Sequence, residues 1–231
     1  MGRVRSFVAF AAGILLCLVG TDVLADSFWS RAVESYDAGT GLNPGLMKID
    51  STEYDGRGSV RNAESAVYSL TWTGGDPEVR ILSVIRNGAD ITSERRANPE
   101  YQSGRPIDGA AGGFGASPLD PTLQDTVTTT FTGIETIDGR RARAYRFGVA
   151  AESGAITGTA WIDAETGFPI RIAGRPDPLP RFVDVFEFRH EFGIGGNGAA
   201  VTSRITVDAS GRLLLIRRRF VVTMEFSEHR P

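Results

Sequence analysis

Residues 132–147 read TGIETIDGRRARAYRF, a pattern typical of a β-hairpin. The IDGR sequence at residues 137–140 supplies the turn, because aspartate and glycine tolerate the backbone conformations that tight hairpin loops require. Beyond the turn, Tyr145, Phe147 and Val149 recur at every second position, which places them on one face of a strand. The stretch therefore predicts two antiparallel strands, one of which carries a row of large apolar side chains.

The same alternation continues on both sides of this hairpin. Residues 156–163 lead through AETG at 164–167 into another strand pattern, and GGDP at 74–77 separates two more. Turn signals about every ten residues favour an antiparallel sheet or barrel over alternating strands and helices. The expected strands are residues 66–73, 79–86, 91–95, 127–134, 143–149, 156–163, 168–173, 182–192, 201–207 and 213–226, with further turns at NG 87–88 and DASG 208–211.

Residues 26–36 carry the one clear helical pattern. Their apolar side chains recur at helical spacings and form a single stripe, as expected of a helix that packs one face on a core. The stripe consists of Phe28, Trp29, Ala32, Val33 and Tyr36.

Residues 97–121 differ from the rest, since nine of these 25 residues are glycine or proline. A segment of this composition is a lid, a disordered insertion or a linker between two small domains. We favour a mobile loop, because the strands that precede it are too few to close a core of their own. Residues 26–231 are therefore expected to form a single domain.

The N-terminus has the features of a signal peptide at residues 1–25. A short basic start precedes an apolar run at residues 7–19, which is too short for a stable transmembrane helix. The VLA sequence at 23–25 suits cleavage before Asp26. A lipoprotein signal using Cys17 is the alternative, but the residue before this cysteine is not small; an uncleaved anchor is a third possibility. We expect an exported protein.

Composition excludes several classes of protein. The chain has 231 residues, 41% of them hydrophobic, and a net charge of −3, which argues against disorder and against a basic nucleic-acid binder. After cleavage before Asp26 it would contain no cysteine and only two histidines, His190 and His229. These are too few ligands for structural zinc, iron–sulfur or haem-thiolate sites, so no metal or cofactor is expected.

Catalytic motifs are incomplete. Ser59 lacks the flanking glycines of a nucleophile elbow, and the H-E-x-x-H pattern that begins at His190 ends in Ile194. Asp163 and Glu165 form a carboxylate pair, but they lie at a turn, where solvated side chains are the ordinary interpretation. We expect a protein that is not an enzyme.

Two of the expected strands, residues 182–192 and 213–226, are apolar on both faces. A sheet with one face in water would instead alternate apolar and polar residues. Residues 182–192 carry Phe182, Phe186, Phe188 and Phe192 at even positions and valines between them. Either a plain sandwich or barrel core covers these side chains, or one face lines a lipid-sized apolar cavity. The arginines at 217–219 either keep an edge solvated or contact an anionic headgroup or partner. The expected cavity residues are Tyr145, Phe147, Trp161, Ile170, Phe182, Phe186 and Phe188.

Three stretches together resemble the LolA-like lipoprotein-carrier superfamily. They are TGIETIDGRRARAYRF at 132–147, GTAWIDAETGFPIRI at 158–172 and RLLLIRRRFVVTMEFSE at 212–228. The resemblance implies an incomplete antiparallel β-barrel, or half-barrel, with an N-terminal helix and few covering helices. It also implies a periplasmic protein whose cavity holds acyl chains in envelope lipid or lipoprotein trafficking, as part of outer membrane biogenesis.

The partners that follow are lipid or lipoprotein acyl chains and, as a second kind, envelope membrane proteins; we expect a monomer that binds no nucleic acid. Two other functions stay open at this point. One is an envelope interaction or regulatory protein with a filled core, and the other is a secreted β-sandwich hydrolase.

Overall fold

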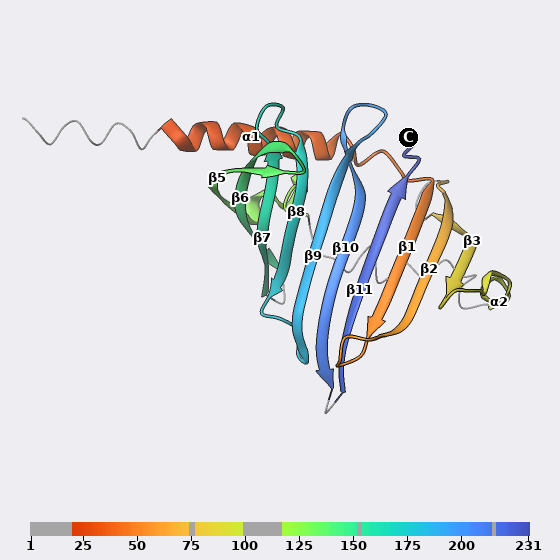
Figure 1. The fold of residues 1–231 in the computed structure, drawn as a ribbon. Helices are drawn as coiled ribbons and strands as arrows, with labels where there is room; N and C mark the ends of the chain where they lie inside the picture. The colour runs from red at the N-terminus through yellow and green to blue at the C-terminus, as the bar shows by residue number, and fades with distance from the viewer. Residues whose placement is uncertain (1–19, 74–76, 99–116, 152–153, 214–215) are drawn as a thin grey trace, which may run out of the picture.

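The computed structural model describes residues 20–73, 77–98, 117–151, 154–213 and 216–231. They form one antiparallel sheet of 11 strands in the order β4-β3-β2-β1-β11-β10-β9-β8-β7-β6-β5, with α1 and α2 far apart along it (Figure 1). The sheet is open, with β4 and β5 at its edges. The elements are α1 (Gly20–Asp37), β1 (Leu46–Tyr54), β2 (Val60–Thr71), β3 (Glu78–Arg86), β4 (Ala89–Asp90), α2 (Thr92–Ala97), the 3-10 helix η2 (Pro121–Thr126), β5 (Val127–Ile137), β6 (Arg140–Ala151), β7 (Gly154–Asp163), β8 (Pro169–Asp177), β9 (Val183–Ile194), β10 (Ala200–Leu213) and β11 (Ile216–Ser227).

The expectation of a mainly antiparallel β fold with an N-terminal helix and few other helices is confirmed. The hairpin at residues 132–147 is the β5–β6 pair, and GGDP at 74–77 lies between β2 and β3, which pair antiparallel. Sequence patterns did not predict β1, which lies between β2 and β11 and joins the first strands of the chain to the last.

Residues 91–95 were expected as a strand, and this is wrong. Only the short β4 follows the NG turn, and the chain then forms α2. The Asp90 carboxylate accepts a hydrogen bond from the Thr92 backbone N–H at 2.8 Å, and the Thr92 hydroxyl accepts one from the Val84 N–H at 2.9 Å. These local side-chain bonds compete with strand pairing and hold α2 against β3.

The turn expected at residues 208–211 is also wrong, because β10 runs through it. Asp208 is paired with Glu187 of β9 on one side and Val221 of β11 on the other. Gly211 does not form a turn; its lack of a side chain lets the backbone at Phe182 approach β10 closely. A Cβ atom there would lie 2.4 Å from the Phe182 carbonyl oxygen.

The face of the sheet that carries α1 has a row across β6 to β9 in which two glycines lie between two phenylalanines. The strand register places Phe147, Gly158, Gly174 and Phe188 side by side in that order. A Cβ on Gly158 would lie 2.8 Å from the Phe147 ring, and one on Gly174 would lie 2.8 Å from the Phe188 ring. The two glycines therefore leave the space that the two rings fill, and both rings are buried.

Helix α1 packs on this row through the stripe predicted from the sequence. Ala32 is fully buried, and the Trp29 ring meets the edge of Tyr145 at a centroid distance of 5.6 Å. The Trp29 indole N–H donates to the Gln124 side chain of η2 at 3.0 Å. The first core cluster comprises Trp29, Ala32, Leu119, Tyr145, Phe147, Val149, Ala160, Ile162, Ile172, Phe188 and Val207.

A second core cluster lies at the other end of the sheet, where α2 contacts β3. Ile91, just before α2, packs against it. Its buried members are Met47, Ala66, Tyr68, Leu70, Ile81 and Val84. The described part of the sheet is thus covered by two separate apolar cores rather than by one.

Two sequence expectations fall partly outside the described residues. Helix α1 begins at Gly20 and spans the cleavage position before Asp26, so cleavage stays a prediction, and residues 1–19 lie outside the described part. Of the loop expected at 97–121, residues 99–116 lie outside it as well, whereas Leu119 is fully buried in the first cluster. Among the described residues no helix combines the length and apolar character needed to span a membrane.

We predict that Phe188→Ala lowers the free energy of unfolding by about 3–5 kcal/mol, because it removes apolar contacts and leaves a void above Gly174. Phe182→Ala is the matched control: Phe182 is 58% exposed, so its truncation should change stability by about 0.5 kcal/mol. Urea unfolding of both variants measures the difference, and equal effects would contradict the packing described.

Candidate functional site

The structure brings four of the seven expected cavity residues onto the α1 face of the sheet and buries a fifth, Ile170. Tyr145, Phe147 and Phe188 are buried in the first cluster, and Phe186 packs against it. Ile170 is buried at the point where the β7–β8 register shifts, between Pro169 and Arg171. These side chains fill space with one another and with α1.

The other two expected residues lie elsewhere. Trp161 points to the opposite face of the sheet, where its indole N–H donates to Glu135 at 2.7 Å, while Ile162 takes the fully buried inward position. Phe182 precedes β9, has a positive φ of 69° and is exposed, because the strand alternation begins only at Val183.

An apolar pocket of about 270 Å³ lies on the α1 face, between the two core clusters. Tyr36 and Ile205 on its wall pack against the first cluster, while Met47 and Phe226 belong to or pack against the second. Its main apolar lining consists of Tyr36, Leu42, Met47, Ile205, Met224 and Phe226. We call this site the seam pocket.

The wall of the seam pocket is set by the way α1 ends. The Ser35 hydroxyl accepts a hydrogen bond from the Ala200 N–H at 3.2 Å, and the Asn197 side chain donates to the Ala38 carbonyl at 3.0 Å. Gly39 then passes directly against β10, since a Cβ there would lie 1.9 Å from the Ala200 carbonyl oxygen. These contacts hold Tyr36 over the sheet, and burial raises the pKa of its hydroxyl.

Sequence reasoning missed the seam pocket because β1 was not predicted. Met47 and Ile49 alternate with Lys48 and Asp50, a period of two that is short and then gives way to polar residues. Met224 lies within the strand expected at residues 213–226, but β1, whose Ile49 pairs with it, was not predicted. The short alternation at 46–50 was the available signal.

His190 lies beside this region in an apolar setting. On the α1 face its strand neighbours are Ile172 of β8 and Ile205 of β10, and its ring lies 5.4 Å from that of Phe188. Burial lowers the pKa of His190 to about 4, and its Nε2 atom has no hydrogen-bond partner among the described residues. His190 is therefore a neutral member of the core at pH 7.

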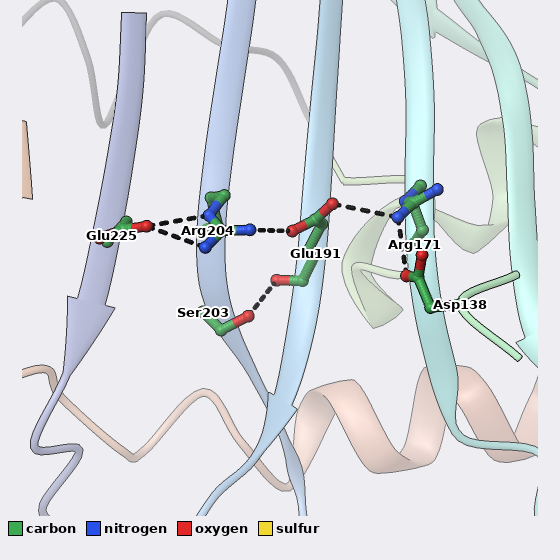
Figure 2. Close-up of polar contacts among 6 residues, drawn as sticks. All are labelled: Asp138, Arg171, Glu191, Ser203, Arg204 and Glu225. Atoms are coloured by element: carbon green, nitrogen blue, oxygen red, sulfur yellow. Dashed lines mark hydrogen bonds and ion pairs between the residues drawn. The ribbon is translucent and has the colours of Figure 1, made fainter. Parts of the chain in front are cut away.

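The opposite face of the sheet carries a chain of ion pairs across four strands, shown in Figure 2. Arg171 of β8 donates to Asp138 at 2.9 Å and to Glu191 of β9 at 3.2 Å. Arg204 of β10 donates to Glu191 at 3.0 Å and to Glu225 of β11 at 3.1 Å. Alternating acids and bases in register satisfy one another across the strands, and we call this row the ion-pair ladder.

Asp163, one of the two carboxylates singled out in the sequence, holds a turn. Burial raises its pKa, but hydrogen bonds from the Thr166 and Glu165 N–H groups and from Arg140 outweigh this and lower the pKa to about 2. The carboxylate is ionised and fully engaged in the β7–β8 turn. Among the described residues, no three His, Cys, Asp or Glu side chains are placed to share a metal ion.

No protein-family model and no curated protein sequence matches this chain. Several solved structures are similar to it. An outer membrane lipoprotein-sorting protein domain from Vibrio parahaemolyticus has a TM-score of 0.43 at 9% identity, and a LolA superfamily protein from Nitrosomonas europaea has 0.38 at 9% identity. A DUF1329 family protein from Desulfovibrio piger has 0.37 at 11% identity. Each comparison covers 89% of this chain and 92% of the other. The similarity to LolA-like proteins expected from the sequence is thus found among solved structures.

We predict that His190→Leu flattens the dependence of stability on pH between about 6.5 and 4. The folded pKa of His190 is lowered, so its contribution is present above pH 6.5 and is lost as the pH falls toward 4. Relative to the wild type, the variant should retain on the order of 2–3 kcal/mol more of its unfolding free energy at pH 4. His229→Gln is the control: burial lowers the pKa of His229 too, but this side chain is more exposed, so the slope should change less than in His190→Leu. Equal slopes in wild type and His190→Leu would refute the assignment.

We predict that Glu191→Gln lowers the free energy of unfolding by about 1–2 kcal/mol, because two arginines lose their shared carboxylate. Glu187→Gln, on the same strand and face but with no ion pair among the described residues, should change it by about 0.5 kcal/mol. The measurement is urea unfolding at low and high salt. If the ion-pair ladder did not stabilise the fold, the two variants would change the free energy of unfolding equally.

Proposed function

We propose that this protein binds the apolar chain of a lipid-like ligand in the seam pocket. The observation that carries the proposal is the position of the pocket between two independently packed clusters, each beside its own helix. A ligand inserted there would bury its surface against both clusters and would displace neither. Each buried methylene group contributes about 0.8 kcal/mol to binding before the entropy of association is subtracted.

Apolar surface continues from the pocket along β11. Phe220, Val222 and Met224 occupy alternate positions and therefore share the α1 face. Met224 is buried at the pocket, Val222 is half-buried, and Phe220 is 47% exposed. This gradient gives an extended chain a surface to follow out of the seam pocket, which suits a long narrow ligand better than a compact one.

The wider role we propose is that of an exported, non-catalytic carrier of lipid or lipoprotein acyl chains in the cell envelope. The expected signal peptide supports the location, and a pocket with mainly apolar walls supports carriage rather than chemistry. The LolA-like resemblance of the hairpin sequences points the same way.

An envelope interaction protein is the second candidate, and one observation favours it. Tyr145, Phe147 and Phe188, three of the aromatic residues expected to line a cavity, are packed in the first cluster, which leaves that part of the sheet filled. If the seam pocket takes up no ligand, its apolar rim would serve as a contact surface for another protein.

We predict that Thr202→Trp weakens binding of a fluorescent fatty acid by tenfold or more. Thr202 lines the seam pocket, and an indole in its place would occupy the volume the chain needs. Thr223→Trp on β11 adds the same group to the opposite face and is the matched control. Fluorescence titration and melting curves of both variants give the result.

Leu42→Glu is a second variant that does not depend on repacking a strand, because Leu42 lies in the segment between α1 and β1. A carboxylate at the pocket wall should also weaken uptake of the fatty acid. Undiminished binding in both pocket variants would refute the seam pocket as the site, and a wild type that binds no fatty acid would favour the interaction protein.

A further inference from the structure

A groove of about 670 Å³ lies on the face of the sheet opposite α1. Apart from Phe188, which belongs to the first core cluster, the side chains that line it come from the positions of β6 to β11 that point away from the two core clusters, as the alternation along each strand requires. Its main lining consists of Arg146, Thr159, Trp161, Ala173, Arg175 and Arg189. The seam pocket is on the other face, so the two sites cannot be parts of one cavity.

The floor of the groove is made by small residues set between arginines. The register places Arg146, Thr159, Ala173 and Arg189 in one row across β6, β7, β8 and β9. Three strand spacings separate the two arginines, about 14 Å between their Cα atoms. Arg175 lies two residues from Ala173 on β8, so a third guanidinium reaches the same hollow.

The guanidinium groups of these three arginines have no hydrogen bond or ion pair in the described part of the chain, although their backbones are paired in the sheet. Their cross-strand neighbours explain why, because Arg146 faces Thr130 and Thr159, while Arg189 faces Ala173 and Thr206. The ion-pair ladder runs in the neighbouring row, where every arginine faces a carboxylate. In the row that forms the floor of the groove, by contrast, neither Arg146 nor Arg189 has a carboxylate on a neighbouring strand opposite it.

Two carboxylates also line the groove, and they do not cancel its charge. Asp208 is bound by Arg219, whose Nε donates to it at 2.8 Å. Glu187 lies next to it in the register, on the side of the groove near β10. Against Arg146, Arg175 and Arg189 this leaves an excess of two positive charges over a concave surface.

We propose that this groove binds a phosphorylated organic ligand. A phosphate group presents several strong acceptor oxygens, which planar guanidinium groups meet with paired N–H donors. The threonine hydroxyls of the floor supply further donors, and the Trp161 ring and Ala173 supply apolar surface for the organic part. The volume exceeds that of an inorganic ion and falls within the range of organic ligand sites.

The test is isothermal titration of the full chain with phenyl phosphate, and sedimentation with vesicles of phosphatidylcholine that either contain or lack phosphatidylglycerol. Binding of phenyl phosphate indicates a soluble phosphorylated ligand, and binding only to vesicles that contain phosphatidylglycerol indicates a lipid headgroup. Either result supports the phosphate site, and binding should weaken with added salt.

Arg146→Gln, Arg175→Gln and Arg189→Gln should each weaken that binding about tenfold, the effect of losing one charge-assisted hydrogen bond. Arg80→Gln, at an exposed arginine of β3 far along the sheet, is the matched control and should bind like the wild type. Binding of neither probe, or binding unchanged in all three groove variants, would overturn the proposal. Fatty-acid uptake in the seam pocket is measured separately and does not depend on these arginines.

Discussion

The packing of α1 on the sheet is the contact on which the rest of the structure depends. An antiparallel sheet with large apolar side chains on one face must cover them, and Trp29 and Ala32 do so above Tyr145. Because α1 ends at Asp37 and contacts mainly β7, β8 and β10, it does not extend over β1 and β11. The seam pocket lies where this cover stops, so the length of one helix sets the position of the candidate site.

The period of two along each strand gives the sheet two chemically different faces from one register. Inward positions supply both core clusters, and outward positions supply the ion-pair ladder and the arginine groove. In the ladder, Glu191 has an arginine on either neighbouring strand. Two residues away, Arg189 faces Ala173 and Thr206 and has no acid on either neighbouring strand. The charges of the ladder pair with one another and therefore stabilise the sheet. The arginines of the groove have no such partners and remain available to bind a ligand.

Much of the fold could be predicted from the sequence, because hairpin turns and alternation are local signals. The α1 stripe and the pairs β2–β3 and β5–β6 follow from them. The turn at DASG 208–211 was wrong because composition cannot show that Asp208 is bound by Arg219 on the neighbouring strand. Which of Trp161 and Ile162 faces inward is likewise decided by pairing, since both are apolar and a shift of one residue exchanges the faces.

The candidate site was harder to predict than the fold for a physical reason. Large aromatic residues were expected around the ligand because their strands are apolar on both faces. The same side chains fill the space beside the sheet so well that they leave no room for a ligand there. Phe147 and Phe188 reach across Gly158 and Gly174 and close that part of the sheet. The lining of the seam pocket includes, beside Tyr36 and Phe226, the methionines Met47 and Met224, whose unbranched, flexible side chains adapt to a variable neighbour. A cavity in such a sheet is therefore better sought where flexible apolar residues meet the end of a covering helix than where aromatic residues are most numerous.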